Sequence, residues 1–368
     1  MKVIMTGGGT GGHIYPAIAI ADEIKKRYPD ADILFVGAER GLEKKLVPQR
    51  GYPIRLIPVT GFDRKNLLKN VKVIRKLMAG NRLAGKIIAD FRPDFVVGTG
   101  GYASAPIVRT AQRMKIPTYI HEQNAYPGVS NKLLEKGSRK VFLGFAKAAE
   151  HFRMQEKLVV SGNPVRDEFM EPDRKKAREK LGLPQEDFVL LAFGGSQGAG
   201  RINKAMISAI RRYNGQEGMR ICLGAGSYYH AAILESFREE GLVPAGNISI
   251  MEYIDDMASY LAAADLVVSR SGALTVAETT VSGTPAVFIP SPMVTGNHQY
   301  YNALAVAEAG GAIIIEEKEL EDERLIERIE ELKADPETLR EMAAKSRACG
   351  PVKASEMICD SILEDYAG

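Results

Sequence analysis

Short apolar runs alternate with longer stretches of helix-compatible sequence along all 368 residues, and this alternation restricts the fold more than any other feature. Runs that are aliphatic or β-branched throughout are typical of strands buried on both faces of a parallel sheet. The alternation of such strands with helices predicts an α/β protein whose sheets are covered by helices on both faces. The expected strands are residues 3–5, 33–36, 95–97, 118–120, 141–143, 189–193, 221–223, 266–268, 286–289 and 313–315.

The two halves of the chain begin alike, because each opens with a strand that leads into a glycine-rich loop. The loops are residues 7–12 and residues 194–198. Between the halves, residues 161–166 end a strand in turn-forming residues, and a charged run follows. We therefore predict two Rossmann-like, doubly wound parallel-sheet domains that face each other across a cleft, with boundaries at 1–163 and 164–368. It stays open whether the C-terminal helix returns to the first domain.

The composition excludes several classes of protein. With 45% hydrophobic and 26% charged residues, the chain is neither a disordered segment nor a collagen-like fibre. Cys222, Cys349 and Cys359 form no metal-binding spacing and no disulfide framework, which fits a reducing cytoplasm. The start lacks the apolar core of a signal peptide, and no apolar run reaches the roughly 18 residues of a transmembrane helix. We expect a protein that is soluble or at most bound to a membrane surface.

The first glycine loop matches a nucleotide-binding pattern, but only weakly. Gly7, Gly9 and Gly12 have the spacing GxGxxG between an expected strand and an expected helix, whose first turn would hold Pro16. With Glu39 as the acid beyond the second strand, the pattern is compatible with a nicotinamide or flavin site. It is equally compatible with a tight turn that binds nothing.

His13 directly follows these glycines and is the first candidate for catalysis. A loop at the carboxyl edge of a parallel sheet would present this side chain to a ligand. The ordinary pKa of histidine suits a general base near neutral pH. The alternative is a buried histidine that only caps the helix.

The second half carries a candidate site for a nucleoside diphosphate. Residues 269–278 follow an expected strand and open a helix with small residues, whose N–H groups and positive dipole end can hold a diphosphate. Glu278 lies about two turns into that helix, where it would accept both ribose hydroxyls unless it is simply a solvated glutamate. The adjacent Asp255 and Asp256 lack a third ligand, so we expect them to cap a helix. We expect no metal or other cofactor, and we expect Arg166 with the helix N-termini to neutralise the leaving group.

Six stretches that span most of the chain together resemble one enzyme family. They are 8–13 (GGTGGH), 100–102 (GGY), 121–124 (HEQN), 162–166 (GNPVR), 194–199 (GGSQGA) and 271–278 (SGALTVAE). The chain is similar to the glycosyltransferases that add N-acetylglucosamine from UDP-N-acetylglucosamine to the lipid-linked muramoyl-pentapeptide precursor of bacterial peptidoglycan. This resemblance implies the two-domain GT-B fold, with the UDP-sugar held mainly by the C-terminal domain and the lipid acceptor by the N-terminal one.

The resemblance also implies a set of binding residues. The backbone of Ile254 would read uracil, Glu278 would bind ribose, and Gln299 would reach the sugar hydroxyls. His298 stands where relatives carry a second glutamine, so a sugar contact is assigned to Gln299 alone. The implied residues of the C-terminal domain are Ser196, Ile254, Ala273, Leu274, Thr275, Val276, Ala277, Glu278 and Gln299, and those of the N-terminal part are Thr10, Gly11, Gly12, Asn124 and Arg166.

The reaction that the resemblance implies is an inverting displacement. The C4 hydroxyl of the acceptor sugar would attack the anomeric carbon of the α-linked donor and give a β linkage. This attack needs a base, for which His13 is the first candidate and Glu122 the second. Two alternatives keep the fold and change the reaction, a UDP-N-acetylglucosamine 2-epimerase and a diacylglycerol glucosyltransferase. A non-catalytic membrane adaptor is an alternative of a different class.

Charge is distributed unevenly along the chain. Residues 1–163 hold 28 basic and 13 acidic side chains, a balance of +15, whereas residues 164–368 hold 21 and 33, a balance of −12. The near-neutral total of +3 does not suggest a dedicated nucleic-acid-binding protein.

A basic amphipathic helix is expected inside the positive half. Nine basic residues and one acid lie between Arg64 and Arg92, and apolar residues at helical spacing accompany them. Three interpretations compete: a solvated face of a helix packed on its own sheet, a nucleic-acid patch, and a surface that meets anionic lipid. The lipid-linked acceptor implied by the resemblance favours the third, which would place the protein peripherally on the cytoplasmic face of the cell membrane. The apolar residues are Leu67, Val71, Ile74 and Met78.

Overall fold

The computed structural model describes residues 1–60, 70–350 and 353–367, and the chain divides into two compact units. Unit 1 is Met1–Arg166 together with Lys353–Gly368, and unit 2 is Asp167–Val352. The division therefore falls three residues after the boundary expected from the sequence. The C-terminal segment belongs to the first unit.

Unit 1 is built on a seven-stranded sheet in which every pair of neighbouring strands is parallel. Its order is β3-β2-β1-β4-β5-β6-β7, so the direction of strand addition reverses between β1 and β4. Such a reversal opens a crevice at the carboxyl ends of the two strands, where ligands bind in doubly wound folds. The strands are β1 Lys2–Thr6, β2 Asp32–Ala38, β3 Ile54–Ile57, β4 Phe95–Gly98, β5 Thr118–Glu122, β6 Lys140–Leu143 and β7 Leu158–Val160.

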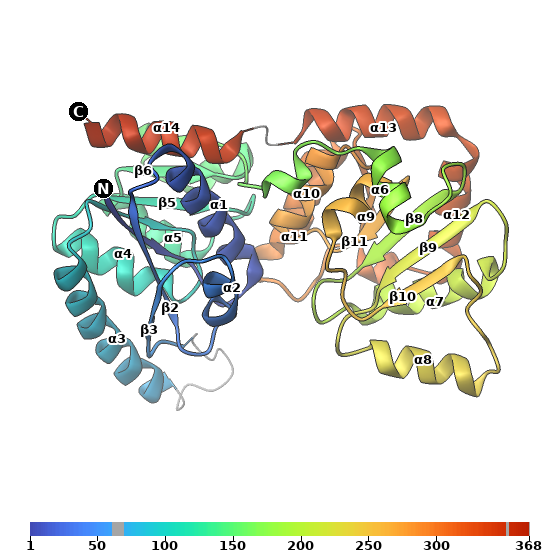
Figure 1. Ribbon diagram of the computed structural model, residues 1–368, viewed down its shortest axis with the longest axis horizontal. Coiled ribbons are helices and arrows are strands. Elements are labelled where there is room, and N and C mark those ends of the chain that lie inside the picture. Colours follow the sequence, from blue (N-terminus) through green and yellow to red (C-terminus); the bar gives the residue numbers. More distant parts are fainter. Residues whose placement is uncertain (61–69, 351–352, 368) are drawn as a thin grey trace. The chain divides into compact units, whose positions relative to one another are not determined.

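Helices cover both faces of this sheet because successive strand residues point to opposite sides. Val3 and Met5 pack under α1 and α14, whereas Ile4 packs with α3 and α4. The α-helices of unit 1 are α1 Gly11–Arg27, α2 Glu43–Gln49, α3 Asn70–Phe91, α4 Ser104–Arg113, α5 Val129–Leu134 and α14 Ala354–Ala367 (Figure 1). Short 3-10 turns are Glu135–Gly137, Ala146–His151 and Gln155–Lys157.

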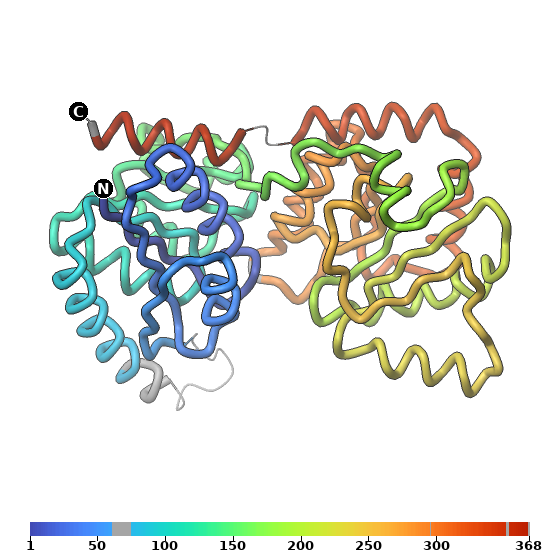
Figure 2. Tube along the Cα trace, in the orientation of Figure 1, coloured from blue at the N-terminus to red at the C-terminus, as the bar shows by residue number. Residues whose placement is uncertain are grey.

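The last helix, α14, lies beside the first helix, α1, although more than 300 residues separate them in sequence (Figure 2). Ile358, Cys359 and Ile362 are fully buried against the α1 side of the sheet. Lys140 adds a polar contact, because its Nζ donates to the backbone oxygen of Ser361 at 2.9 Å. The C-terminal helix is therefore part of the core of unit 1.

The described part of α3 carries exposed basic residues, but its apolar stripe differs from the expected one. Ala84 and Ile88 face the core, whereas Met78, which was expected in the stripe, is 68% exposed. In the rest of the basic segment, Arg64, Lys65, Leu67 and Lys69 lie outside the described residues, as do the side chains of Val71, Lys72 and Ile74.

Unit 2 repeats the plan with a six-stranded, fully parallel sheet of order β10-β9-β8-β11-β12-β13. The order reverses between β8 and β11. The strands are β8 Phe188–Phe193, β9 Met219–Gly224, β10 Ile248–Met251, β11 Leu266–Ser269, β12 Ala286–Phe288 and β13 Ala312–Ile314. The helices are α6 Arg174–Leu181, α7 Gly200–Tyr213, α8 His230–Glu239, α9 Met257–Ala263, α10 Ala273–Ser282, α11 His298–Ala307, α12 Asp322–Ala334 and α13 Pro336–Ala348, with 3-10 turns Asp167–Phe169, Thr295–Asn297 and Glu317–Glu319.

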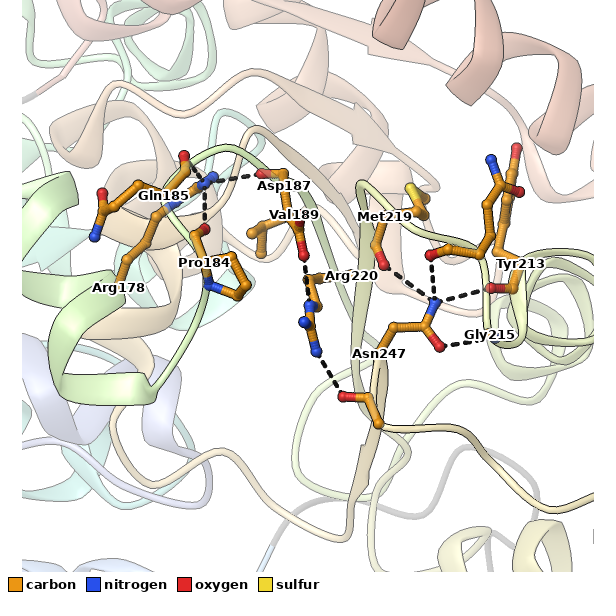
Figure 3. A network of polar contacts seen from close by, with 12 residues as sticks. Arg178, Pro184, Gln185, Asp187, Val189, Tyr213, Gly215, Met219, Arg220 and Asn247 are labelled. Carbon is orange, nitrogen blue, oxygen red and sulfur yellow. Dashed lines mark hydrogen bonds and ion pairs between the residues drawn. The ribbon is translucent and has the colours of Figure 1, made fainter.

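A polar network fixes the amino ends of the unit 2 strands, at the edge opposite the glycine loop (Figure 3). The Arg178 side chain is fully buried and donates to the backbone oxygens of Pro184, Gln185 and Asp187 at 2.7–3.1 Å. Asn247 donates to the backbone oxygens of Tyr213, Gln216 and Met219 at 2.8–3.2 Å. The opposite edge is thereby left for ligand-binding loops.

The predicted fold class, two Rossmann-like parallel-sheet domains, is confirmed. Each expected strand overlaps an observed one, and both glycine loops follow the first strand of their sheet. The sequence prediction missed three strands, β3, β7 and β10, which all lie at sheet edges. None of the described helices is long and apolar enough to cross a bilayer.

Candidate functional site

The glycine loop of unit 1 ends at the amino terminus of α1, at the carboxyl edge of the sheet. Gly9 has φ of +90°, and a side chain there would approach the Tyr102 ring to 2.9 Å, so glycine is required. The first intrahelical bond joins the N–H of His13 to the oxygen of Thr10, at 3.2 Å. The N–H groups of Gly11 and Gly12 precede that bond and can bind an anion. Thr10 and Gly12 are exposed.

Pro16 does not lie in the first helical turn, where it was expected. The helix begins at Gly11, so Pro16 is its sixth residue. The missing N–H of a proline removes the bond to the oxygen four residues earlier, here that of Gly12. The early start of the helix places His13 in the first turn.

His13 is half-buried, and its ring is held by two acceptors that directly follow the neighbouring strands β4 and β5. Nδ1 lies 3.1 Å from the backbone oxygen of Thr99 and 2.9 Å from Oε1 of Gln123. Within the described ranges, Nε2 has no protein hydrogen-bond partner. A side chain at Gly100, where φ is +99°, would come within 3.0 Å of Nδ1. The structure therefore places the imidazole at the crevice between β1 and β4.

Glu122, the second candidate base, is buried and fully engaged by protein donors. Oε1 accepts from the backbone N–H of Asn124 at 3.0 Å and from its side-chain amide at 3.2 Å. Oε2 accepts from the N–H of Gly128 and from Nδ2 of Asn131, both at 2.9 Å. Four donors on two oxygens make this carboxylate an organiser of the loop after β5. The half-buried Asn124 is held in that loop.

Arg166 is the last residue of the N-terminal part of unit 1. Its guanidinium carbon lies 5.0 Å from the centre of the Tyr15 ring, a cation–π contact with α1. This contact brings a positive side chain to the helix that begins at the glycine loop. Sequence-predicted residues Thr10, Gly11, Gly12 and His13 lie at the start of the same helix.

The glycine loop of unit 2 is built in the same way after β8. Gly195 and Gly198 have φ of +91° and +84°, and a side chain at Gly198 would lie 2.1 Å from the backbone oxygen of Ala225. Ser196 is exposed at the tip of the loop. The loop therefore presents backbone and hydroxyl groups at the carboxyl edge of the sheet, before α7.

Helix α10 begins immediately after β11, at the crevice of unit 2. The first intrahelical bond joins the N–H of Val276 to the oxygen of Gly272, at 2.9 Å. The three preceding N–H groups are thus available to a diphosphate. Leu274, Thr275 and Glu278 are half-exposed, whereas Ala273, Val276 and Ala277 are buried. Of the segment predicted from 273 to 278, three side chains are therefore partly exposed to solvent.

Ile254 lies on the loop after β10, and Gln299 lies in the first turn of α11. The Ile254 side chain is buried against Gly224, where an added Cβ would approach it to 2.8 Å. Oε1 of Gln299 accepts from the N–H of Ser291 at 2.9 Å. This bond fixes which side of the amide carries the oxygen and which carries the nitrogen. Gln299 and the glycine loop line one cavity of about 440 Å³, together with Arg201, Tyr229, Arg270, Ser291 and Glu317.

Three residues that matter to these sites were not identified from the sequence. Gln123 contacts His13, and the buried Glu43 accepts from the N–H of Gly9 at 3.0 Å. Arg270 pairs with Glu317 at the cavity of unit 2. The motif HEQN contained the signal for Gln123, but Glu43 lies in an unremarkable charged segment, and only the fold brings it to the loop.

The expected helix cap is present at Asp256, whose Oδ1 accepts from the N–H of Ser259 at 3.3 Å. Lys180 pairs with the same carboxylate at 2.7 Å. In the described part of the chain, no group of three His, Cys, Asp or Glu side chains is arranged to hold a metal ion.

Comparison with known proteins gives matches over nearly the full length. Residues 3–143 match the glycosyltransferase family 28 N-terminal domain, and residues 189–357 match the family 28 C-terminal domain. The UDP-N-acetylglucosamine--N-acetylmuramyl-(pentapeptide) pyrophosphoryl-undecaprenol N-acetylglucosamine transferase of Acetivibrio thermocellus is 45% identical over 99% of this chain and 98% of its own length. The protein of that name from Clostridioides difficile is 40% identical over the whole chain and 89% of its own length.

Solved structures agree with these matches. The MurG structure from Acinetobacter baumannii has a TM-score of 0.76 and 27% identity, with 99% of each chain covered. A putative UDP-N-acetylglucosamine 2-epimerase from Listeria monocytogenes has a TM-score of 0.73 at 16% identity, over all of this chain and 96% of its own, and shows a shared fold only. With full-length relatives at 40–45% identity and both family domains present, the chain belongs to the family 28 glycosyltransferases.

Proposed function

We propose that this protein transfers N-acetylglucosamine from UDP-N-acetylglucosamine to the C4 hydroxyl of a lipid-linked muramoyl-pentapeptide. The names of its full-length relatives support this donor and acceptor. The observation that carries the proposal is the placement of His13 at the amino terminus of α1, with Nδ1 held by two acceptors. A base at the crevice of unit 1 suits a transferase that must activate a hydroxyl.

Unit 2 would hold the donor through the open face of α10 and the loops beside it. The N–H groups before Val276 and the exposed Ser196 suit a diphosphate. Glu278 lies one helical turn beyond Leu274 and Thr275 on the open face, where a carboxylate can accept both ribose hydroxyls. The backbone at Ile254 would read uracil, and the amide of Gln299 would donate to the sugar.

The proposed step is a single displacement at the anomeric carbon. The acceptor O4 forms a bond to C1 as the bond from C1 to the diphosphate oxygen breaks, which inverts the configuration. The hydroxyl proton passes to Nε2 of His13, and UDP leaves with the electron pair of the broken bond. Positive charge from Arg166 and from the helix amino termini would stabilise the departing diphosphate. Within unit 1, Thr10, Gly11, Gly12 and Asn124 would contribute to the binding of substrate.

Glu122 is assigned a supporting role in this proposal. Its carboxylate already accepts four hydrogen bonds, and a base needs a free lone pair within reach of the proton. His13 is therefore the base that the geometry favours.

The decisive experiment incubates the protein with UDP-N-acetylglucosamine, with and without a lipid-linked muramoyl acceptor. Transfer predicts UDP release only when acceptor is present, whereas an epimerase would form an epimer without acceptor and an adaptor would form neither product. His13→Ala should lower kcat by about 10²-fold or more, the effect usual for loss of a general base. A near-normal kcat with intact donor binding would remove His13 from that role.

For localisation, we propose that α3 meets the anionic cytoplasmic face of the membrane. Arg75, Met78, Arg82 and Lys86 are exposed, and their spacing of three and four residues places them on one helical face. A cationic face with an exposed apolar side chain is typical of helices that lie on anionic bilayers. The +15 balance of residues 1–163 supports the same orientation.

Sedimentation with vesicles tests this surface. Binding to vesicles that contain anionic lipid should fall steeply as salt rises, and Arg75→Glu with Arg82→Glu should abolish it. Lys175→Glu with Lys204→Glu is the matched control, because both lysines are exposed on unit 2. Vesicle binding that depends neither on the anionic lipid content nor on the salt concentration would contradict the proposal.

A further inference from the structure

A continuous chain of hydrogen bonds runs through the buried interior of unit 1 and ends on His13. Nε2 of His121 lies 3.1 Å from the backbone oxygen of Gly162. Nδ1 of His121 lies 2.8 Å from Nε2 of Gln123, and Oε1 of Gln123 lies 2.9 Å from Nδ1 of His13. His121 is fully buried and Gln123 is 1% exposed, so water does not interrupt the chain.

The chain begins at the backbone oxygen of Gly162, and the chemistry of that oxygen determines which atom donates in each of the following hydrogen bonds. A backbone oxygen only accepts, so Nε2 of His121 carries a proton and donates it to Gly162. Burial, with a smaller effect from His13, lowers the pKa of His121 to about 4, although the bond to Gly162 opposes this shift. His121 is therefore neutral near pH 7, and its Nδ1 is an acceptor.

The amide of Gln123 is fixed by the same logic. Its Nε2 must be the group that donates to Nδ1 of His121, and it also lies 3.2 Å from the backbone oxygen of His121, which again only accepts. Oε1 therefore faces His13. Since an amide oxygen has no proton to give, Nδ1 of His13 must be the donor.

A second acceptor confirms this direction independently. The backbone oxygen of Thr99 lies 3.1 Å from the same Nδ1 of His13. Two oxygens that only accept thus converge on one ring nitrogen, and the neutral imidazole carries its single proton there. Its other nitrogen, Nε2, is then left with a lone pair.

We propose that Gln123, oriented by His121, is a positioning residue that fixes His13 in the Nδ1–H tautomer and so makes Nε2 the basic atom. The use of Nε2 in transfer rests on the proposed function, whereas the tautomer does not. When Nε2 takes the acceptor's proton, Nδ1 keeps its own, and both oxygens stabilise the resulting imidazolium. No proton moves along the chain, and the captured proton leaves from Nε2 to water after the product has gone.

An amide at this position has a different effect from a carboxylate. A carboxylate on Nδ1 would place a negative charge beside the ring, whereas the neutral Gln123 orients the ring without adding charge. No carboxylate of the described residues hydrogen-bonds the ring. Titratable or charged side chains that flank the ring or its loop include Glu43, Tyr102, His121, Glu122 and Arg166.

Nitrogen NMR tests the tautomer without any substrate. In protein labelled with ¹⁵N-histidine, only the five histidines contribute ring nitrogen signals, and His13→Ala identifies those of His13. At a pH where His13 is neutral, we expect Nδ1 to show the shift of a protonated nitrogen and Nε2 that of an unprotonated one. A neutral His13 with its proton on Nε2 would overturn the inference, whatever the enzymatic activity.

Two substitutions test the role of Gln123. Gln123→Glu places a negative charge beside Nδ1, which favours the protonated ring, so the acid limb of the pH dependence of kcat should move to higher pH by about one unit or more. Gln123→Met should lower kcat by about tenfold or more with little change in donor KM, because Thr99 alone remains to hold the ring. The control is Gln112→Met, which removes a structural amide bonded to Thr118, Leu134 and Ser138. A folded Gln123→Glu protein with an unchanged acid limb of kcat would overturn the proposal, as would equal effects of Gln112→Met and Gln123→Met on kcat.

Discussion

The carboxylate of Glu43 accepts a hydrogen bond from the backbone N–H of Gly9, 34 residues earlier in the chain, with Oε2 and the nitrogen 3.0 Å apart. Its other oxygen accepts from the N–H of Ala38 at 2.8 Å, at the end of β2. Gly8 and Gly37 both pack against the Glu43 side chain, and a Cβ added to either glycine would lie within 2.4 Å of it. The loop that leads to His13 is therefore shaped by a buried side chain outside it.

Glu43→Ala should destabilise unit 1 and impair catalysis. The substitution leaves two N–H groups without their acceptor, at about 1–3 kcal/mol for each buried group. Urea unfolding would report this loss of free energy, and steady-state kinetics should show a lower kcat. The control is Glu39→Ala, because Glu39 lies only four residues before Glu43 but is exposed to solvent. Equal stability of the two variants would contradict the role assigned to Glu43.

Gly100→Ala should displace the His13 ring. The added Cβ would lie 3.0 Å from Nδ1, and φ of +99° is itself unfavourable for alanine. We expect kcat to fall at least tenfold, since small displacements of a catalytic group have large effects. Gly51→Ala separates the two causes, because φ is +80° there and no described heavy atom lies within 4 Å of the added carbon. That control should lose about 1 kcal/mol of stability and keep its kcat.

The central strands of both sheets were predictable because burial on both faces leaves a continuous apolar run. The segment FVLLAF of β8 is an example, with five of its six residues buried. The edge strands β3 (IRLI), β7 (LVV) and β10 (ISIM) were missed, since each is short and only partly buried. An edge strand pairs with a neighbour on one side only and is exposed to solvent on the other, so its hydrophobic pattern is weaker.

The candidate site was predictable where a motif is local and not where it depends on the fold. His13 and the start of α10 adjoin glycines or small residues after a strand, which is a signal within a few positions. Gln123 meets His13 across 110 residues, and no spacing along the chain encodes that contact. The orientation of α3 was also inaccessible, because periodicity gives a stripe without saying which stripe faces the sheet.

Glu278→Gln should weaken donor binding with little effect on kcat. A carboxylate that accepts hydrogen bonds from the ribose would be replaced by an amide of the same size. Hydrogen bonds to charged groups are worth about 1.5–3 kcal/mol, which corresponds to roughly a 10- to 100-fold rise in donor KM. Calorimetric titration with UDP should show the same loss in Kd. Glu327→Gln, on an exposed part of α12, is the control and should bind UDP normally.

Arg178→Met should strongly destabilise unit 2 while leaving its substrate sites intact. The guanidinium is completely buried and pairs with Asp265 at 2.7 Å, in addition to its bonds to backbone oxygens. Removing one partner of a buried ion pair costs about 3–5 kcal/mol. Arg174 contacts the other oxygen of Asp265 at 2.6 Å, but its side chain is 55% exposed, so Arg174→Met should cost less than about 1 kcal/mol. Urea unfolding measures both variants, and similar losses would contradict the assigned difference.

Unit 1 should lose stability as the pH falls below about 6.5, because His121 resists protonation in the folded state. Burial lowers its pKa from 6.5 to about 4, so the unfolded chain binds the proton more readily than the folded one. Stability is therefore fully present above the unfolded pKa and declines as the pH falls toward 4, at about 1.4 kcal/mol per pH unit and about 3 kcal/mol in all. His121→Asn removes the titrating group and should flatten the pH dependence of the unfolding free energy over this window, even though the variant starts less stable. His151→Asn, a half-buried histidine elsewhere in unit 1, is the matched control and should keep the slope of the unsubstituted protein. An unchanged slope in His121→Asn would assign the acid sensitivity of unit 1 to other groups.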